Sequence, residues 1–80
     1  MYATSWCPYC ERARQLLRGK GVAFEEISIE EHPERRAEMI QRSGRRTVPQ
    51  VFIGGQHIGG SDDLHALDHA GALDALLKGP

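Results

Sequence analysis

The sequence MYATSWCPYC, residues 1–10, places a short apolar stretch, a loop with two cysteines and the start of a helix in direct succession. Residues 1–4 are a candidate strand. Pro8 suits the first turn of a helix, where its missing N–H would have had no partner. Cys7 and Cys10 are the two cysteines of the chain, and at this spacing a disulfide between them closes within one helical turn. The stretch predicts a strand that leads into a helix through a redox loop.

The apolar pattern beyond this stretch alternates between strand and helix. It predicts helices over about residues 8–20, 33–43 and 61–70, strands over residues 22–29, 50–53 and 56–58, and a last helical turn over residues 73–77. Gly54-Gly55 indicates a hairpin, because glycine accepts the positive φ of primed turns. Ser61 is the expected cap of the third helix.

Three details of this pattern carry expectations about burial. In the first helix, Glu11, Arg12, Arg14, Gln15 and Arg18 fall largely on the outer side. In the second, Ala37 and Ile40 should face inward, and in the third Leu64, Leu67 and Ala70 share a side. Within residues 22–29 the apolar positions change phase, which requires a bulge or burial on both faces.

The order β-α-β-α-β-β-α predicts an α/β fold in which one four-stranded mixed sheet is flanked by helices. Its weak point is the first strand, which should be central and yet is very short. Eighty residues make one domain, residues 1–80, with a thin core.

Charge and composition narrow the class of protein. Ten basic and eleven acidic side chains give a formal net charge of −1, which argues against a nucleic-acid binder. No stretch approaches the roughly 18 apolar residues of a membrane span. Two close cysteines suit a reducing compartment and a redox role. We therefore expect a soluble cytoplasmic protein, monomeric by default and without a membrane partner.

The spacing of Cys7 and Cys10 suits thiol chemistry. Cys7 should sit exposed at the helix cap, where the positive helix end stabilises a thiolate, and should act as the nucleophile. Cys10 should be less accessible and should resolve the mixed disulfide. The alternative is a zinc site with His65 and His69, which stand four residues apart but more than fifty residues beyond Cys10. We expect no metal, and read all four histidines as surface residues.

Four blocks of the chain together resemble glutaredoxins, most closely their small bacterial dithiol class. The blocks are Trp6-Cys7-Pro8-Tyr9-Cys10, Thr47-Val48-Pro49, Gly54-Gly55 and Gly59-Gly60-Ser61-Asp62-Asp63. They follow the order and spacing of that family across essentially the whole chain. The resemblance implies a thioredoxin fold with Pro49 as a cis proline that faces the cysteines.

The same resemblance implies a glutathione site. The backbone of Val48 would pair with the cysteinyl residue of glutathione, and Tyr9 would flank its sulfur. Gly60, Ser61, Asp62 and Asp63 would hold the γ-glutamyl end. Arg45 is a candidate for the glycine carboxylate, and Thr47 belongs to the matched loop. The other arginines nearby, Arg35, Arg36, Arg42 and Arg46, are expected to form a solvated basic face.

The implied activity is glutathione-dependent thiol–disulfide exchange with no tightly bound cofactor and glutathione as co-substrate. Its protein substrates would be glutathionylated or disulfide-containing proteins, with ribonucleotide reductase a candidate by family. Three alternatives stay open: a similar protein fed by thioredoxin reductase, a scaffold that holds a [2Fe–2S] cluster, and the N-terminal domain of a glutathione transferase. One departure stands out, since many glutaredoxins carry lysine where this chain has Thr4.

Overall fold

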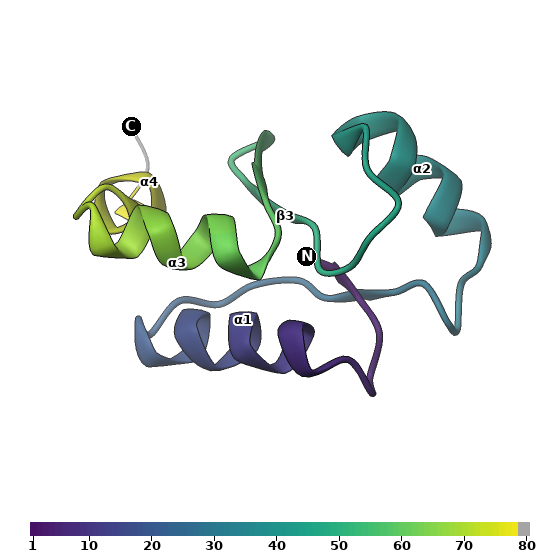
Figure 1. Ribbon diagram of the computed structural model, residues 1–80, viewed down its shortest axis with the longest axis horizontal. Helices are drawn as coiled ribbons and strands as arrows, with labels where there is room; N and C mark the ends of the chain where they lie inside the picture. Colours follow the sequence, from purple (N-terminus) through teal and green to yellow (C-terminus); the bar gives the residue numbers. More distant parts are fainter. Residues whose placement is uncertain (79–80) are drawn as a thin grey trace.

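A computed structural model describes residues 1–78 of the chain. Its elements are β1 (Tyr2–Ala3), α1 (Pro8–Gly19), β2 (Ile27–Ser28), α2 (Glu34–Ser43), β3 (Val51–Ile53), β4 (Gln56–Gly59), α3 (Ser61–His69) and α4 (Leu73–Lys78) (Figure 1). The predicted order of strands and helices is confirmed. Within residues 1–78, no helix has the length and apolar character that a membrane crossing requires.

The strands form two two-stranded ladders, β1-β2 and β3-β4, which an isolated bridge joins in the order β2-β1-β3-β4. β1 runs parallel to β2, with Tyr2 opposite Ile27, and β3 runs antiparallel to β4. Tyr2 and Gln50 join the two ladders, because their N–H and C=O groups exchange hydrogen bonds of 2.9 and 3.1 Å. At the tip of the hairpin, Gly54 and Gly55 have φ values of 58° and 82°, as a primed turn requires.

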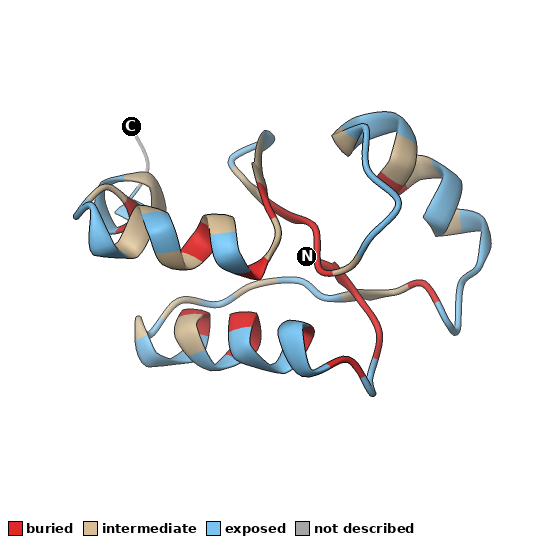
Figure 2. Ribbon diagram, viewed as in Figure 1, coloured by how far each residue is buried: buried red, intermediate tan, exposed pale blue. Residues whose placement is uncertain are grey.

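Alternation along the strands divides the buried side chains between two faces of the sheet. Successive strand side chains point to opposite faces. Ala3 and Val51 join the core beneath α1, α3 and α4, whereas Tyr2 joins Met39 of α2 in a second core. In Figure 2 the buried positions line the inner side of α1 and run along β1. The two cores place α1 and α3 on one face and α2 on the other.

The second predicted strand is much shorter than expected. Only Ile27–Ser28 pairs with β1, because the ladder ends where the amino group of Met1 donates to the carbonyl of Glu25 at 2.7 Å. The preceding residues, 22–26, lie outside any strand. The apolar positions of residues 22–29 change phase because the segment is buried on both faces. Phe24 packs against the core of α1 and α3, and Ile27 packs against the core of α2.

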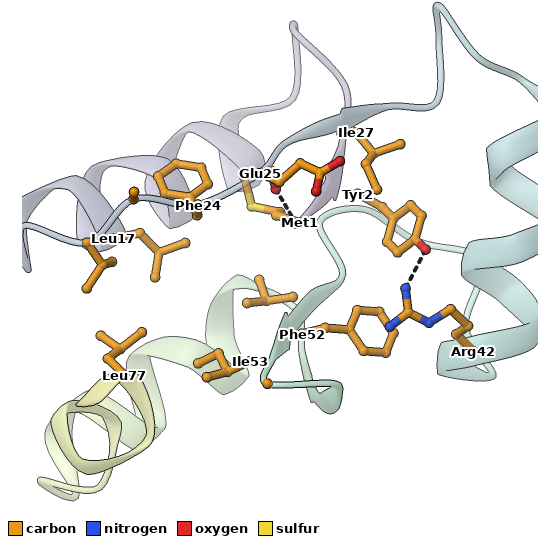
Figure 3. Close-up of a pocket in the computed structure, with 14 residues that line it drawn as sticks. Met1, Tyr2, Leu17, Phe24, Glu25, Ile27, Arg42, Phe52, Ile53 and Leu77 are labelled. Atoms are coloured by element: carbon orange, nitrogen blue, oxygen red, sulfur yellow. Dashed lines mark hydrogen bonds between the residues drawn. The ribbon is translucent and has the colours of Figure 1, made fainter. Parts of the chain in front are cut away.

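A cavity of about 340 Å³ lies between residues 22–27 and β3 (Figure 3). Its walls are mostly apolar, with Phe24 and Leu77 on one side and Phe52 on another. At its rim the Arg42 guanidinium donates to the Tyr2 hydroxyl at 2.8 Å and lies 4.2 Å from the centre of the Phe52 ring. Arg42 therefore contacts two aromatic rings while it stays exposed, in keeping with the expected solvated basic face.

Helix orientation corrects two further expectations. Met39 is the buried residue of α2, and Ala37 is exposed because two residues correspond to about 200° around a helix. In α3, Leu64 is buried as expected, while Ala70 lies beyond the last turn and is exposed. The predicted end of α2 at Gly44 is confirmed, with φ of 73°.

Candidate active site

Cys7 caps the N-terminus of α1. Its backbone is extended, with φ −83° and ψ 120°, and its carbonyl accepts the first helical hydrogen bond from Glu11 at 3.1 Å. Pro8 takes the first helical position, as predicted. The side chain is not exposed as expected, since Cys7 is only 8% accessible. Burial follows because the thiol points to the carbonyl oxygen of Val48, 3.9 Å away in the facing loop.

The surroundings of Cys7 favour its thiolate. Burial opposes ionisation, but hydrogen bonds from the Cys10 N–H and thiol, the Tyr9 N–H and the Thr4 hydroxyl outweigh it, so the pKa of Cys7 is lowered. Three of these donors belong to the first turn of α1, where backbone N–H groups lack helical partners. The prediction that the helix start activates Cys7 is supported by this geometry.

Cys10 has the opposite character. It lies on the inner face of α1, is fully buried, and its pKa is raised to about 11 because burial and the adjacent Cys7 disfavour a second negative charge. Both cysteines are free thiols. An ionisable Cys7 beside a protonated Cys10 is the asymmetry that a nucleophile and a resolving thiol need.

The loop opposite the cysteines contains a cis peptide bond between Val48 and Pro49, as the resemblance implies. Val48 is half-buried, and no group within residues 1–78 accepts its N–H. Thr47 is exposed, and its carbonyl accepts a 2.9 Å hydrogen bond from the Gln50 side chain, which fixes the loop to the start of β3. The loop thus offers a free backbone donor beside Cys7.

The start of α3 lies next to this loop. A Cβ atom on Gly60 would approach the Pro49 carbonyl to 3.4 Å, so the two backbones are in close contact. Gly60, not Ser61, is the N-cap, because Ser61 is buried in the first helical turn and the Asp63 carboxylate accepts the Gly60 N–H at 2.9 Å. Asp62 is exposed beside them.

Arg45 reaches the same place from the other side. Its guanidinium donates to Asp63 Oδ2 at 2.8 Å, with both side chains about half exposed. This pair, together with the Gly60 N–H, holds the pKa of Asp63 below its ordinary value. Cys7, the Val48–Pro49 bond, Gly60, Asp63 and Arg45 therefore form one continuous chain of contacts.

Two exposed aromatic residues flank Cys7 in the sequence. Trp6 is 74% and Tyr9 55% accessible, and they are the large exposed hydrophobic side chains of residues 1–78. Tyr9 is thus close to Cys7 in the sequence and open to solvent, and its expected place beside the glutathione sulfur stays a prediction. Trp6 belongs to the motif that identified the loop, although the sequence reading gave it no role.

The sequence reading missed a buried ion pair beneath the cysteines. Arg14 was expected on the outer side of α1 but is only 6% accessible. Its guanidinium donates to the Glu26 carboxylate at 2.6 and 2.8 Å and to the Thr4 carbonyl at 2.8 Å. Glu11 accepts a further bond at 3.2 Å. Helical spacing alone gave no signal for this network, because Glu26 and Thr4 are distant in sequence.

The histidines do not lie together. His57 is half-buried rather than on the surface, since its Nε2 is 2.7 Å from Gln50 Oε1 and burial lowers its pKa. His65 is half-buried with Nδ1 at the Ser61 carbonyl, 2.7 Å away, and His32 and His69 are exposed. Among residues 1–78, no three Cys, His, Asp or Glu side chains come together as a metal site would require.

The fold and this arrangement of thiols define a thiol–disulfide oxidoreductase of the thioredoxin fold. A family model described as Glutaredoxin matches residues 1–58. The chain is 60% identical to Glutaredoxin of Pseudomonas aeruginosa over 78 residues, 98% of this chain and 93% of that protein. It is 59% identical to Glutaredoxin 3 of Escherichia coli K12, over 98% of this chain and 94% of that one.

Solved structures of glutaredoxins have the same fold as this chain. The solution structure of glutaredoxin from Brucella melitensis superposes with a TM-score of 0.84 at 57% identity, covering 96% of this chain and 84% of that one. The crystal structure of a buckwheat glutaredoxin–glutathione complex gives a TM-score of 0.89 at 34% identity, covering 96% and 73%. The chain belongs to the glutaredoxin family, and it is similar to glutaredoxin 3 over nearly its whole length.

Proposed function

We propose that this glutaredoxin is a glutathione-dependent oxidoreductase that reduces protein–glutathione mixed disulfides and protein disulfides. Cys7 is the nucleophile and Cys10 the resolving thiol. The observation that carries the proposal is the position of Cys7 at the start of α1, with a lowered pKa and its sulfur 3.9 Å from the Val48 carbonyl.

With a glutathionylated protein, the Cys7 thiolate attacks the glutathione sulfur. A Cys7–glutathione disulfide forms, the original S–S bond breaks, and the protein leaves as a thiolate that takes a proton from water. A second glutathione thiolate attacks the bound glutathione sulfur, which gives glutathione disulfide and restores Cys7. The proposed cycle needs glutathione as co-substrate and no tightly bound cofactor.

With a protein disulfide, Cys7 first forms a mixed disulfide with the protein. Cys10 then attacks Cys7, the protein thiolate leaves, and glutathione reduces the Cys7–Cys10 bond. Glutaredoxin potentials of about −200 to −230 mV lie near the roughly −220 to −260 mV of the extracted glutathione pool. The pool can therefore drive this reduction without a large uphill step.

The contacts around Cys7 support glutathione as the reductant. An extended peptide could pair with the free N–H of Val48, and a carboxylate suits the unpaired amides at the start of α3. Asp63 offers a carboxylate for an ammonium group, and Arg45 offers a guanidinium for a second carboxylate. The relative from buckwheat was solved as a glutathione complex.

The wider setting is also a proposal. We place the protein in the cytoplasm as a monomer, acting on glutathionylated or disulfide-containing proteins. Ribonucleotide reductase is a candidate substrate by family. The Arg45 and Asp63 side chains already pair with each other, so binding of glutathione would require this pair to open or to share its hydrogen bonds.

The test is reduction of a glutathione mixed disulfide in the presence of glutathione, NADPH and glutathione reductase. Wild type, Cys7→Ser and Cys10→Ser are compared. We expect Cys7→Ser to be inactive and Cys10→Ser to retain activity, because the first route needs one cysteine. A wild-type protein that is inactive here but active with thioredoxin reductase would refute glutathione dependence.

A further inference from the structure

Thr4 has a buried hydroxyl without a partner. The residue follows β1 directly and is 5% accessible. Among residues 1–78, its Oγ1 is the buried side-chain oxygen or nitrogen that lacks a hydrogen bond. Burying a hydroxyl without a partner is unfavourable, because the group loses its hydrogen bonds to water. Because the unpartnered hydroxyl is unfavourable in the resting protein, we expect another state of the protein in which it has a hydrogen-bond partner.

The backbone of Thr4 is held by the ion pair between Arg14 and Glu26. Arg14 donates to the Thr4 carbonyl at 2.8 Å, and the same guanidinium is bound to Glu26 by two hydrogen bonds. Because α1 and the chain before β2 both anchor this carbonyl, the buried hydroxyl is carried on a fixed backbone position.

The Thr4 hydroxyl acts on the ionisation of both cysteines. It lowers the pKa of Cys7 and of Cys10, and the Thr4 N–H favours an ionised Cys10 as well. A neutral thiol is a weak acceptor, whereas a thiolate is a strong one. The hydroxyl thus gains a full partner only when a cysteine ionises.

Cys10 needs such a donor more than Cys7 does. Cys7 also receives the N–H groups of Tyr9 and Cys10, whereas both donors that favour an ionised Cys10 come from Thr4. Arg14, a cation that interacts with Cys10, is already paired with Glu26 and Glu11. Without the Thr4 donors, a thiolate at Cys10 would form in a fully buried place beside a cation that is already paired.

We propose that the Thr4 hydroxyl serves as the hydrogen-bond donor to the Cys10 thiolate in the resolving step, and so controls entry into the dithiol route. This inference rests on the proposed role of Cys10 as the resolving thiol, and it does not require glutathione. Thr4 is a positioning residue that stabilises the attacking group without itself reacting.

The resolving step is a thiol–disulfide exchange at the Cys7 sulfur. Cys10 loses its proton to solvent, and Thr4 donates its hydroxyl hydrogen bond to the resulting thiolate. The Cys10 sulfur then forms a bond to the Cys7 sulfur as the bond from Cys7 to the substrate sulfur breaks. The substrate leaves with the electron pair as a thiolate and is protonated by water.

The test follows both thiols with a chromogenic aromatic disulfide, dithiobis(nitrobenzoate), in stopped flow. Attack by Cys7 releases one coloured thiolate, and resolution by Cys10 releases the second. Wild type is compared with Thr4→Val, which replaces the hydroxyl by a methyl group, and with Thr4→Ser, which keeps a hydroxyl. Both rates are measured across a range of pH, and thermal unfolding of the reduced proteins is followed in parallel.

We expect the inflection of the second release to move up by about one pH unit in Thr4→Val, the effect of one hydrogen bond to a thiolate. At neutral pH the second release should slow at least about threefold, because the higher nucleophilicity of the more basic thiolate offsets part of a tenfold loss of thiolate. The first release should change less, and Thr4→Ser should restore the second.

Three results would overturn the proposal. The second release in Thr4→Val could match wild type at every pH, or it could slow without recovery in Thr4→Ser. Reduced Thr4→Val could also unfold at a lower temperature than wild type, which would mean that the hydroxyl has a structural partner. Since the first release reports Cys7 and needs no glutathione, a failure of glutathione dependence would leave this test unaffected.

Discussion

Replacing Glu26 by glutamine tests the buried ion pair beneath the active site. Glu26 accepts hydrogen bonds of 2.6 and 2.8 Å from Arg14, whose side chain is 7% accessible, while that of Glu26 is 32% accessible. Glutamine keeps the shape and one acceptor oxygen but removes the charge. Arg14 would keep the Thr4 carbonyl and the longer bond to Glu11.

The expected cost lies between two limits. Removing one partner of a fully buried pair costs about 3–5 kcal/mol, whereas an exposed pair contributes about 1 kcal/mol or less. Because Arg14 is buried and Glu26 is about one-third accessible, we expect Glu26→Gln to lower the free energy of unfolding by about 2 kcal/mol. In a domain of this size that corresponds to a loss of about 8–16 °C in melting temperature.

The assay is urea and thermal unfolding of reduced protein at neutral pH, with Glu31→Gln as a matched control at an exposed site. Arg14 holds the pKa of Glu26 below its ordinary value, so this stabilisation is present above the unfolded-state pKa and is lost as the pH falls through the folded-state value. The difference between wild type and variant should therefore narrow in acid. A cost equal to that of Glu31→Gln at neutral pH would refute the reasoning.

Arg45→Ala should raise the KM for a glutathionylated substrate several-fold and bring the pKa of Asp63 back toward its ordinary value, because the 2.8 Å ion pair is lost; an unchanged KM would remove Arg45 from the site. Gly59→Ala should lower the free energy of unfolding by at least about 1 kcal/mol, since φ is +126° and the new Cβ would clash with Asp63 Oδ2; urea unfolding at wild-type stability would contradict this contact. Alkylation by iodoacetamide at neutral pH should modify Cys7 alone, since the pKa of Cys7 is lowered and that of Cys10 is raised to about 11. Peptide mapping that finds both cysteines modified at similar rates would show that this asymmetry is wrong.

Most of the fold could be predicted from the sequence, because single residues with strong backbone preferences mark the ends of its elements. The helix start at Pro8, its end near Gly19 and the Gly54–Gly55 turn depend on backbone preferences of single residues, and each is confirmed. The cis bond at Pro49 came from the family resemblance. The order of strands could be predicted from the order of the elements, since few topologies connect such elements without crossing connections.

What the sequence could not show depends on tertiary contacts. Burial of Cys7 arises from a loop more than forty residues away, and the burial of Arg14 from its pairing with Glu26. A charged residue on a helix is expected in solvent until its partner is known. The predicted length of the second strand was wrong for a related reason. The pattern of Val22 and its neighbours is typical of a strand, but these residues do not pair with β1.

The full burial of Cys10 also bears on damage by peroxides. An oxidant that reaches Cys7 converts it to a sulfenic acid, and further oxidation would make the sulfur unrecoverable by thiols. Cys10 is shielded from the oxidant and lies beside Cys7, so it can condense with the sulfenic acid to a disulfide and release water. The resulting Cys7–Cys10 disulfide is the same as the oxidised state of the proposed dithiol route. The same pair of sulfurs that exchanges disulfides thereby confines oxidative injury to a reversible form.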